Sequence, residues 1–98
     1  MIKTHRNFLL PESNGYHVNI DINPIGHLDI DIIESKEHHD SEFEQVTFKH
    51  AGAVTHIQGV DQHNKQLWNL PLHCQDAREL NALILRANDE FETLMRDL

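Results

Sequence analysis

Nine histidines are the residues of this sequence whose chemistry is most versatile, because imidazole transfers protons near neutral pH and binds metals. A zinc site needs three or four converging ligands, usually at short spacings such as His-x-x-x-His on a helix. The only tight cluster is His38-His39-Asp40, in a polar segment, residues 35–41, that we expect to be a mobile loop. His17 and His27 with acidic neighbours are a second arrangement, although strand residues four positions apart are separated by about 13 Å. The sequence therefore assigns no metal ligands and no cofactor, and histidine-based metal binding stays an alternative function.

Three aspartates form the second group of residues with chemical potential. Asp21, Asp29 and Asp31 alternate with apolar residues on the two sides of the turn Asn23-Pro24-Ile25-Gly26. Paired carboxylates can act as acid and base in catalysis when an enclosed cleft tunes their pKa values. Strict alternation instead indicates an open sheet face, which favours a surface role over catalysis.

Cys74 is the only cysteine, which excludes an internal disulfide and a cysteine-rich zinc site. It precedes a predicted helix, and a helix N-terminus can lower the pKa of a thiol. Its neighbour His73 points away from it on an extended segment, so we interpret Cys74 as a small structural residue. Phosphate-binding glycine loops, dinucleotide fingerprints and hydrolase signatures do not occur in the sequence. We assign no catalytic residues, and a small enzyme or enzyme subunit of unknown substrate stays a second alternative.

The aspartates are positioned by a predicted β-hairpin. Apolar residues occupy alternate positions from Tyr16 to Ile22 and from Leu28 to Ile32, a pattern typical of two antiparallel strands. Only one register puts all of these side chains on a single face, and it pairs Val18 with Ile32, Ile20 with Ile30, and Ile22 with Leu28. Residues 24–26 then form a three-residue loop in which Gly26 adopts the left-handed conformation.

The same register defines the opposite face of the hairpin. Asp21 lies opposite Asp29, and Asn19 lies opposite Asp31. Like charges directly opposite each other destabilise a sheet by about 0.2–1 kcal/mol. A solvated outer face is the simpler interpretation; the more specific one is that charge is needed to bind a basic partner or, less often, a hard cation. We therefore take Asn19, Asp21, Asp29 and Asp31 as candidate partner-binding residues.

The remaining strands are less clearly marked. We expect a short strand or strap in residues 1–10, a turn at 11–15, a strand at 43–50 and a break at 51–53. A second hairpin is predicted for residues 54–60 and 66–70, with Asn64 able to take a left-handed turn conformation and Pro71 ending the strand. Loops of two or of four residues both place Ile57, Trp68 and Leu70 on one face, so its register stays open.

One long helix is predicted from Ala77 to Leu98. Asp76 and Glu79 fit the N-cap and N3 positions of a capping box. Apolar residues then recur every three or four positions, among them Leu80, Ile84, Phe91, Leu94 and Leu98. We expect this stripe to pack across the isoleucine face of the first hairpin. A coiled-coil dimer through the same positions is the alternative, although the alanines at positions 77 and 87 would weaken it.

Size and composition indicate a single domain, residues 1–98, because 98 residues with 39% hydrophobic content can build one modest core. The predicted fold class is α+β, with an antiparallel β-sheet of about four to five strands (two hairpins) covered on one face by a single long C-terminal helix. No apolar run reaches the length of a membrane span or of a signal-peptide core. We expect a cytoplasmic protein.

The charge balance limits the classes of partner. Acidic residues outnumber basic residues 16 to 8, which gives a net charge of −8, and the lysines and arginines are scattered. Nucleic acids and anionic membranes attract clustered lysine and arginine, so neither is expected as a partner. We expect a small acidic interaction domain of the inhibitor, immunity or adaptor type, which docks on the basic surface of another protein and is itself a monomer or weak homodimer.

Overall fold

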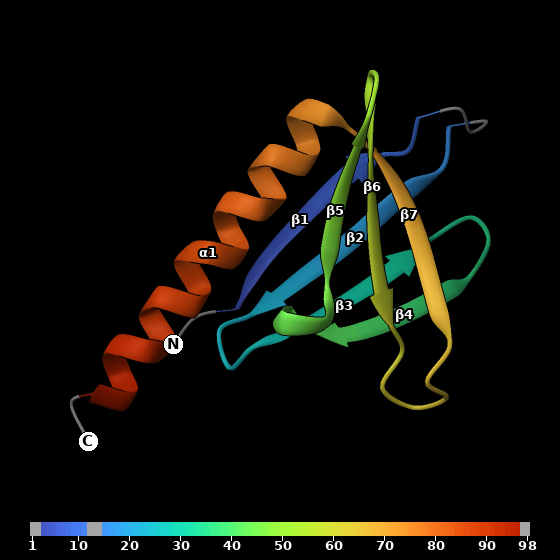
Figure 1. Ribbon diagram of the computed structural model, residues 1–98. Coiled ribbons are helices and arrows are strands. Elements are labelled where there is room, and N and C mark those ends of the chain that lie inside the picture. Colours follow the sequence, from blue (N-terminus) through green and yellow to red (C-terminus); the bar gives the residue numbers. More distant parts are fainter. Residues whose placement is uncertain (1–2, 12–14, 97–98) are drawn as a thin grey trace.

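In the computed structural model, residues 3–11 and 15–96 are described, and they form seven strands and one long helix (Figure 1). The elements are β1 (Thr4–Leu9), β2 (His17–Asn23), β3 (His27–Ile32), β4 (Glu37–Glu42), the 3₁₀ turn η1 (Phe43–Gln45), β5 (Thr47–Ala51), β6 (Val54–Val60), β7 (Leu67–His73) and α1 (Cys74–Arg96). The strands form two antiparallel sheets, ordered β1-β2-β3-β4 and β5-β6-β7. The predicted α+β class is confirmed; the strands number seven in two sheets, where about four to five in one sheet were expected.

The first hairpin has the predicted register. Val18 pairs with Ile32, Ile20 with Ile30, and Ile22 with Leu28, and all of these residues are buried. The turn between the strands is closed by the Gly26 N–H, which donates to the Asn23 carbonyl over 3.0 Å. Gly26 has a φ of 103°, a backbone conformation that favours glycine because a side chain would be strained there. The alternating sequence was sufficient to determine this register because a slip by one residue would turn the isoleucines toward water.

The isoleucine face is covered by the three-stranded sheet and by α1, which contacts β2, β6 and β7 (Figure 1). Among the helix residues whose side chains are described, Ala77, Leu80, Ile84 and Ala87 are buried. The packing of the helix against the hairpin is therefore confirmed for its first half. Beyond this point α1 extends past the sheets; Phe91 is only half-buried and Met95 is 54% exposed. The side chain of Leu94 and residue Leu98 lie outside the described part of the chain.

The predicted mobile loop at residues 35–41 is wrong. Residues Glu37–Glu42 form β4, which pairs with β3 along its whole length, and Asp40 and Ser41 are buried. This strand has no apolar residue, so its sequence lacks the alternation that marks a half-buried strand. It is held by polar contacts to β6, β7 and the loop between them.

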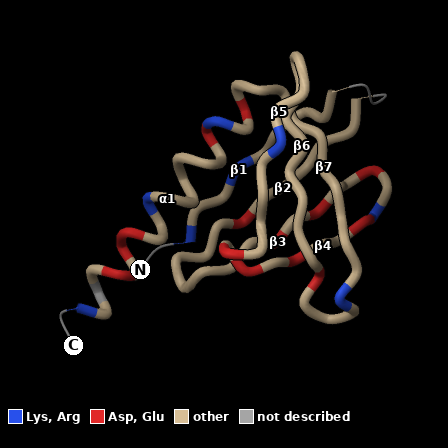
Figure 2. The backbone as a smooth tube through the Cα atoms, viewed as in Figure 1, with Lys and Arg blue, Asp and Glu red and all other residues tan. Residues whose placement is uncertain are grey.

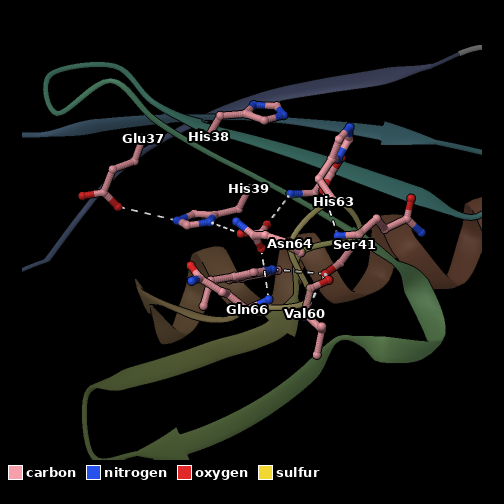
Figure 3. A network of polar contacts seen from close by, with 12 residues as sticks. Glu37, His38, His39, Ser41, Val60, His63, Asn64 and Gln66 are labelled. Carbon is pink, nitrogen blue, oxygen red and sulfur yellow. Dashed lines mark hydrogen bonds and ion pairs between the residues drawn. The ribbon is translucent and has the colours of Figure 1, made fainter.

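Ser41 is the centre of these contacts (Figure 3). Its hydroxyl donates to the Val60 carbonyl over 2.6 Å and accepts from the Val60 N–H at 3.0 Å and from the Trp68 indole N–H at 3.1 Å. The indole ring in turn packs on Gly59, where a Cβ would lie 2.5 Å from its Cζ2 atom. On the other side, His39 stacks on Trp68 with ring centroids 5.7 Å apart. This cluster fastens the edge of the four-stranded sheet to the three-stranded sheet.

The loop of the second hairpin has four residues, which is one of the two lengths that the sequence allows. Ile57 pairs with Leu70, and Asp61 N–H donates to the Gln66 carbonyl over 2.9 Å, which leaves residues 62–65 as the loop. Lys65, with φ of 58°, is the left-handed residue of this loop, so the assignment of that conformation to Asn64 is wrong. The Asn64 side chain instead accepts a hydrogen bond from the Gln66 N–H at 3.0 Å.

Three further boundaries differ from the expected ones. Pro71 does not end its strand, because β7 is an edge strand and runs to His73; a proline on an edge does not interrupt the hydrogen bonds to the neighbouring strand. The helix begins at Cys74, so Asp76 lies in its first turn and is not the N-cap. The expected strand 43–50 begins only at Thr47, after η1. The short N-terminal strand is confirmed as β1, whereas most of the turn expected at 11–15 falls outside the described residues.

Candidate functional site

The outward-facing side of the four-stranded sheet, which we call the outer face, brings the four predicted residues together. In the register of β2 and β3, Asp21 lies opposite Asp29 and Asn19 lies opposite Asp31, as expected. The register of β3 and β4 adds Asp40 opposite Asp29. Three aspartates therefore form a row across neighbouring strands. Asp40 was missed because β4 was not recognised as a strand.

The predicted carboxylates reach solvent to different extents. The exposed fraction of the side chain is 57% for Asp31, 30% for Asp21 and 29% for Asp29. Asn19 is half-buried, and its side-chain oxygen accepts a hydrogen bond from the Asn7 amide on β1. A partner can therefore contact all three carboxylates without a rearrangement of the sheet.

A histidine lies beside each of these carboxylates. His5 contacts Asp21, His27 Nε2 lies 3.4 Å from Asp29 Oδ1, and His38 Nδ1 lies 2.7 Å from Asp31 Oδ1. The hydrogen bond with Asp31 raises the pKa of His38 above its usual value, against the effect of partial burial and with help from the charges of nearby aspartates.

Lysine and arginine are absent from the outward positions of the described strands β1–β4. Arg6, the only arginine of β1, lies opposite Ile20 and therefore on the other side of the sheet, where its Nε is 3.6 Å from Glu79 of α1. Lys3 precedes β1, and its Nζ is 4.0 Å from Asp21. Figure 2 shows acidic segments along β2, β3 and β4 and also on α1, where basic segments lie as well. Lysine and arginine therefore do not alternate with the carboxylates on the outward positions of the described strands β1–β4.

The loop between β6 and β7 is attached to one edge of the outer face through Asp40 and Asp61. Asp61 Oδ1 accepts from the Asp40 N–H at 3.0 Å, and Asp61 Oδ2 lies 3.1 Å from His39 Nδ1. The Gln62 N–H donates to Asp40 Oδ1 over 3.2 Å. These bonds bring His63, which follows in the loop, to 3.3 Å from Asp40 Oδ2 (Figure 3). No local sequence pattern predicts this meeting of residues more than twenty positions apart.

At the opposite end of β2, His17 is paired with Glu34. The His17 N–H donates to Glu34 Oε1 over 2.6 Å, and its Nδ1 lies 2.7 Å from Oε2. These two hydrogen bonds hold the pKa of Glu34 below its ordinary value. His17 and His27 are each the first residue of an antiparallel strand and therefore lie at opposite ends of the hairpin, so the structure does not bring them together as a metal site.

Cys74 is in contact with a histidine, but not with its neighbour His73. Its Sγ lies 3.4 Å from His50 Nδ1 and accepts a hydrogen bond from the Thr55 hydroxyl at 3.3 Å. The thiol also lies 3.5 Å from the Gly52 carbonyl oxygen, to which it can donate. These bonds tie the start of α1 to the β5–β6 hairpin, in agreement with a structural role for the cysteine.

A hollow of about 680 Å³ opens between the β2–β3 turn, η1 and the middle of α1. Its lining includes Asn23, His27, Phe43 and Phe91. Its carboxylates, Glu42 and Glu44, are exposed. The carboxylates that line the hollow are thus open to solvent.

Comparison with known proteins finds no matching family model, no similar curated protein and no similar solved structure. Within the described residues, no helix has the length and apolar character that crossing a membrane requires.

Proposed function

We propose that this protein is a small acidic interaction domain that docks on the basic surface of another protein through the outer face, with Asn19, Asp21, Asp29 and Asp31 as the contact residues. The observation that supports this most strongly is the arrangement of the carboxylates. They share one face, stand opposite one another on paired strands, and have no lysine or arginine among the outward positions of the described strands.

The spacing of these groups suits a partner that presents several basic side chains. Adjacent strands lie about 4.8 Å apart, and alternate residues along a strand lie about 7 Å apart. Arginine can bind a carboxylate through two parallel hydrogen bonds, which supplies geometric specificity in addition to charge. Asp21 and Asp31, on neighbouring strands and diagonal to each other, could each receive one such side chain.

The charge of the whole chain acts in the same direction. A net charge of −8 attracts a basic partner over a distance and accelerates encounter, most strongly at low salt. The same charge repels nucleic acids and anionic lipid surfaces. A role in the cytoplasm as an inhibitor, immunity or adaptor protein is consistent with this chemistry.

The test replaces Asp21 and Asp31 by asparagine in one protein and compares it with a control of equal charge, Asp89→Asn with Glu90→Gln. The control residues are exposed on α1, away from the outer face. Tagged wild-type protein should capture a basic partner at low salt, the outer-face variant should lose it, and the control should retain it. Asp29 is left intact because it also lies close to His27 and Asp40.

Equal capture by the wild type and the outer-face variant would show that the outer face is not the docking surface. Equal loss in the variant and in the control would show that net charge alone, and not the arrangement of carboxylates, drives the capture. Circular dichroism of all three proteins establishes that each variant is folded.

A further inference from the structure

Three groups that commonly bind transition metals converge at one edge of the outer face. His27 and Asp29 point outward from β3, and Asp40 lies directly opposite Asp29 on β4. One ligand atom from each residue lies within 4.8 Å of both others. We infer that His27, Asp29 and Asp40 form a binding site for a divalent transition-metal ion, with Zn²⁺ as the ion that fits best, and that His63 supplies the fourth ligand.

The distances agree with such a site. Ligand atoms around a tetrahedral zinc are about 3.3–3.5 Å apart when the metal–ligand bonds are about 2.0–2.2 Å. His27 Nε2 lies 3.4 Å from Asp29 Oδ1 and 3.9 Å from Asp40 Oδ2. The ligand atoms of Asp29 and Asp40 lie within 4.8 Å of each other, so a bound ion would draw the three side chains closer together.

His63 approaches the same carboxylate from the β6–β7 loop. Its Nδ1 lies 3.3 Å from Asp40 Oδ2, the oxygen that also faces His27. Its side chain is 86% exposed, so the imidazole can rotate toward an ion without displacing other residues. The loop that carries it is held in place by the hydrogen bond from the Gln62 N–H to Asp40 Oδ1.

Asp40 distinguishes this cluster from an ordinary patch of surface acids. Its side chain is only 9% exposed, and its two oxygens have separate roles. Oδ1 is fixed by the Gln62 N–H, whereas Oδ2 faces two imidazoles. Hydrogen-bond donors commonly orient the carboxylates that bind metals in this way.

The ligand types select the class of metal. Imidazole suits zinc, copper, nickel and iron, whereas calcium and magnesium prefer oxygen ligands alone. Two imidazoles and two carboxylates at the corners of a tetrahedron match zinc, and the two carboxylate charges balance the charge of the ion. The site shares Asp29 with the proposed docking surface but does not include Asp21 or Asp31, so substitution of those two aspartates tests the docking function separately.

Calorimetric titration of the chelator-treated protein with Zn²⁺ at about pH 7.5, where histidine is mostly neutral, tests the inference. One ion should bind per chain with high affinity. His27→Gln and Asp29→Asn should each weaken binding by at least about tenfold. The matched control His73→Gln removes an exposed imidazole from the other sheet and should bind as the wild type does.

Thermal unfolding is a second measurement of zinc binding, and it applies also to variants whose stability is altered. The thermal midpoint of the wild type and of His73→Gln should rise in Zn²⁺, because an ion that binds only the folded state stabilises it. The midpoint of His27→Gln should rise much less. The inference is overturned if the wild type binds no zinc, if His27→Gln binds it as tightly as the wild type, or if His73→Gln loses as much affinity as His27→Gln. The Asp21→Asn, Asp31→Asn protein should keep its zinc affinity, which separates this result from that of the docking test.

Discussion

At the scale of single residues, the histidines of the described chain act mainly as partners of carboxylates. His5, His17, His27, His38 and His63 each lie within 4.0 Å of an aspartate or glutamate oxygen. The sequence shows the histidines but not these pairs, because most partners are distant in the chain and meet only through strand register. A high histidine content therefore does not by itself identify a metal site, and the convergence of three ligands near β4 is the more specific observation.

The pair of His17 and Glu34 gives a prediction with a defined pH dependence. The pKa of Glu34 is lowered in the folded protein from its ordinary value of 4.5, so ionised Glu34 stabilises the fold above that pH. This stabilisation is lost as the pH falls below 4.5 and through the lower folded-state pKa. Glu34→Gln should therefore lower the free energy of unfolding in urea at neutral pH, and the difference from the wild type should shrink at about pH 3. A difference of the same size at both pH values would contradict this role. The control is Glu90→Gln, which replaces an exposed glutamate on α1.

Ser41 gives a second prediction at this scale. Its hydroxyl is fully buried and satisfies three groups, the N–H and carbonyl of Val60 and the indole N–H of Trp68. Ser41→Ala should lower the free energy of unfolding by at least about 1–3 kcal/mol, the cost of one unpaired buried polar group. Ser35→Ala, at an exposed position before β4, should change it by less than about 0.5 kcal/mol. Urea denaturation measures both, and equal stability of the two variants would show that the cluster around Ser41 does not hold the sheets together.

At the scale of elements, a strand could be predicted from the sequence where apolar packing stabilises it, and not where polar contacts do. The β2–β3 hairpin was predicted to the residue because alternating isoleucines leave one possible register. The strand β4 was missed because its inward positions, His39 and Ser41, are held by hydrogen bonds and ring stacking, which have no periodic signal in the sequence. For the same reason, the sequence did not predict that Asp40 lies close to His27 and Asp29. Lys36, just before β4, and Lys65, in the β6–β7 loop, have positive φ, so neither of these left-handed positions is marked by a glycine or an asparagine.

The helix provides the prediction for this scale. Its first half packs on the core and its second half projects beyond the sheets, so equal truncations should have unequal effects. Leu80 is fully buried, and Leu80→Ala should destabilise the protein by about 2–5 kcal/mol. Met95 is 54% exposed, and Met95→Ala should cost less than about 0.5 kcal/mol. A similar loss for both variants in urea unfolding would mean that the far end of α1 is also packed, for example against a second copy of the chain.

At the scale of the whole molecule, the two sheets and the helix separate apolar and charged surfaces. The shared core lies between the sheets and under the first half of α1, whereas Asp21, Asp29 and Asp31 occupy strand positions on the opposite side of the four-stranded sheet. The projecting helix makes the molecule elongated, with extents of 47 × 29 × 21 Å. The arrangement leaves the outer face open for contact, while the oligomeric state, monomer or weak homodimer, stays a prediction.

The rate of association with the captured partner is the most direct test of the outer face as a docking surface. Surface plasmon resonance at increasing salt compares the wild type, the Asp21→Asn, Asp31→Asn protein and the Asp89→Asn, Glu90→Gln control. The association rate of the wild type should be fast and fall steeply with salt, because complementary charges steer the encounter. The outer-face variant should associate more slowly, with a weaker salt dependence, and dissociate faster, while the control should stay close to the wild type. Indistinguishable rates for the two variants across the salt series would contradict the proposal.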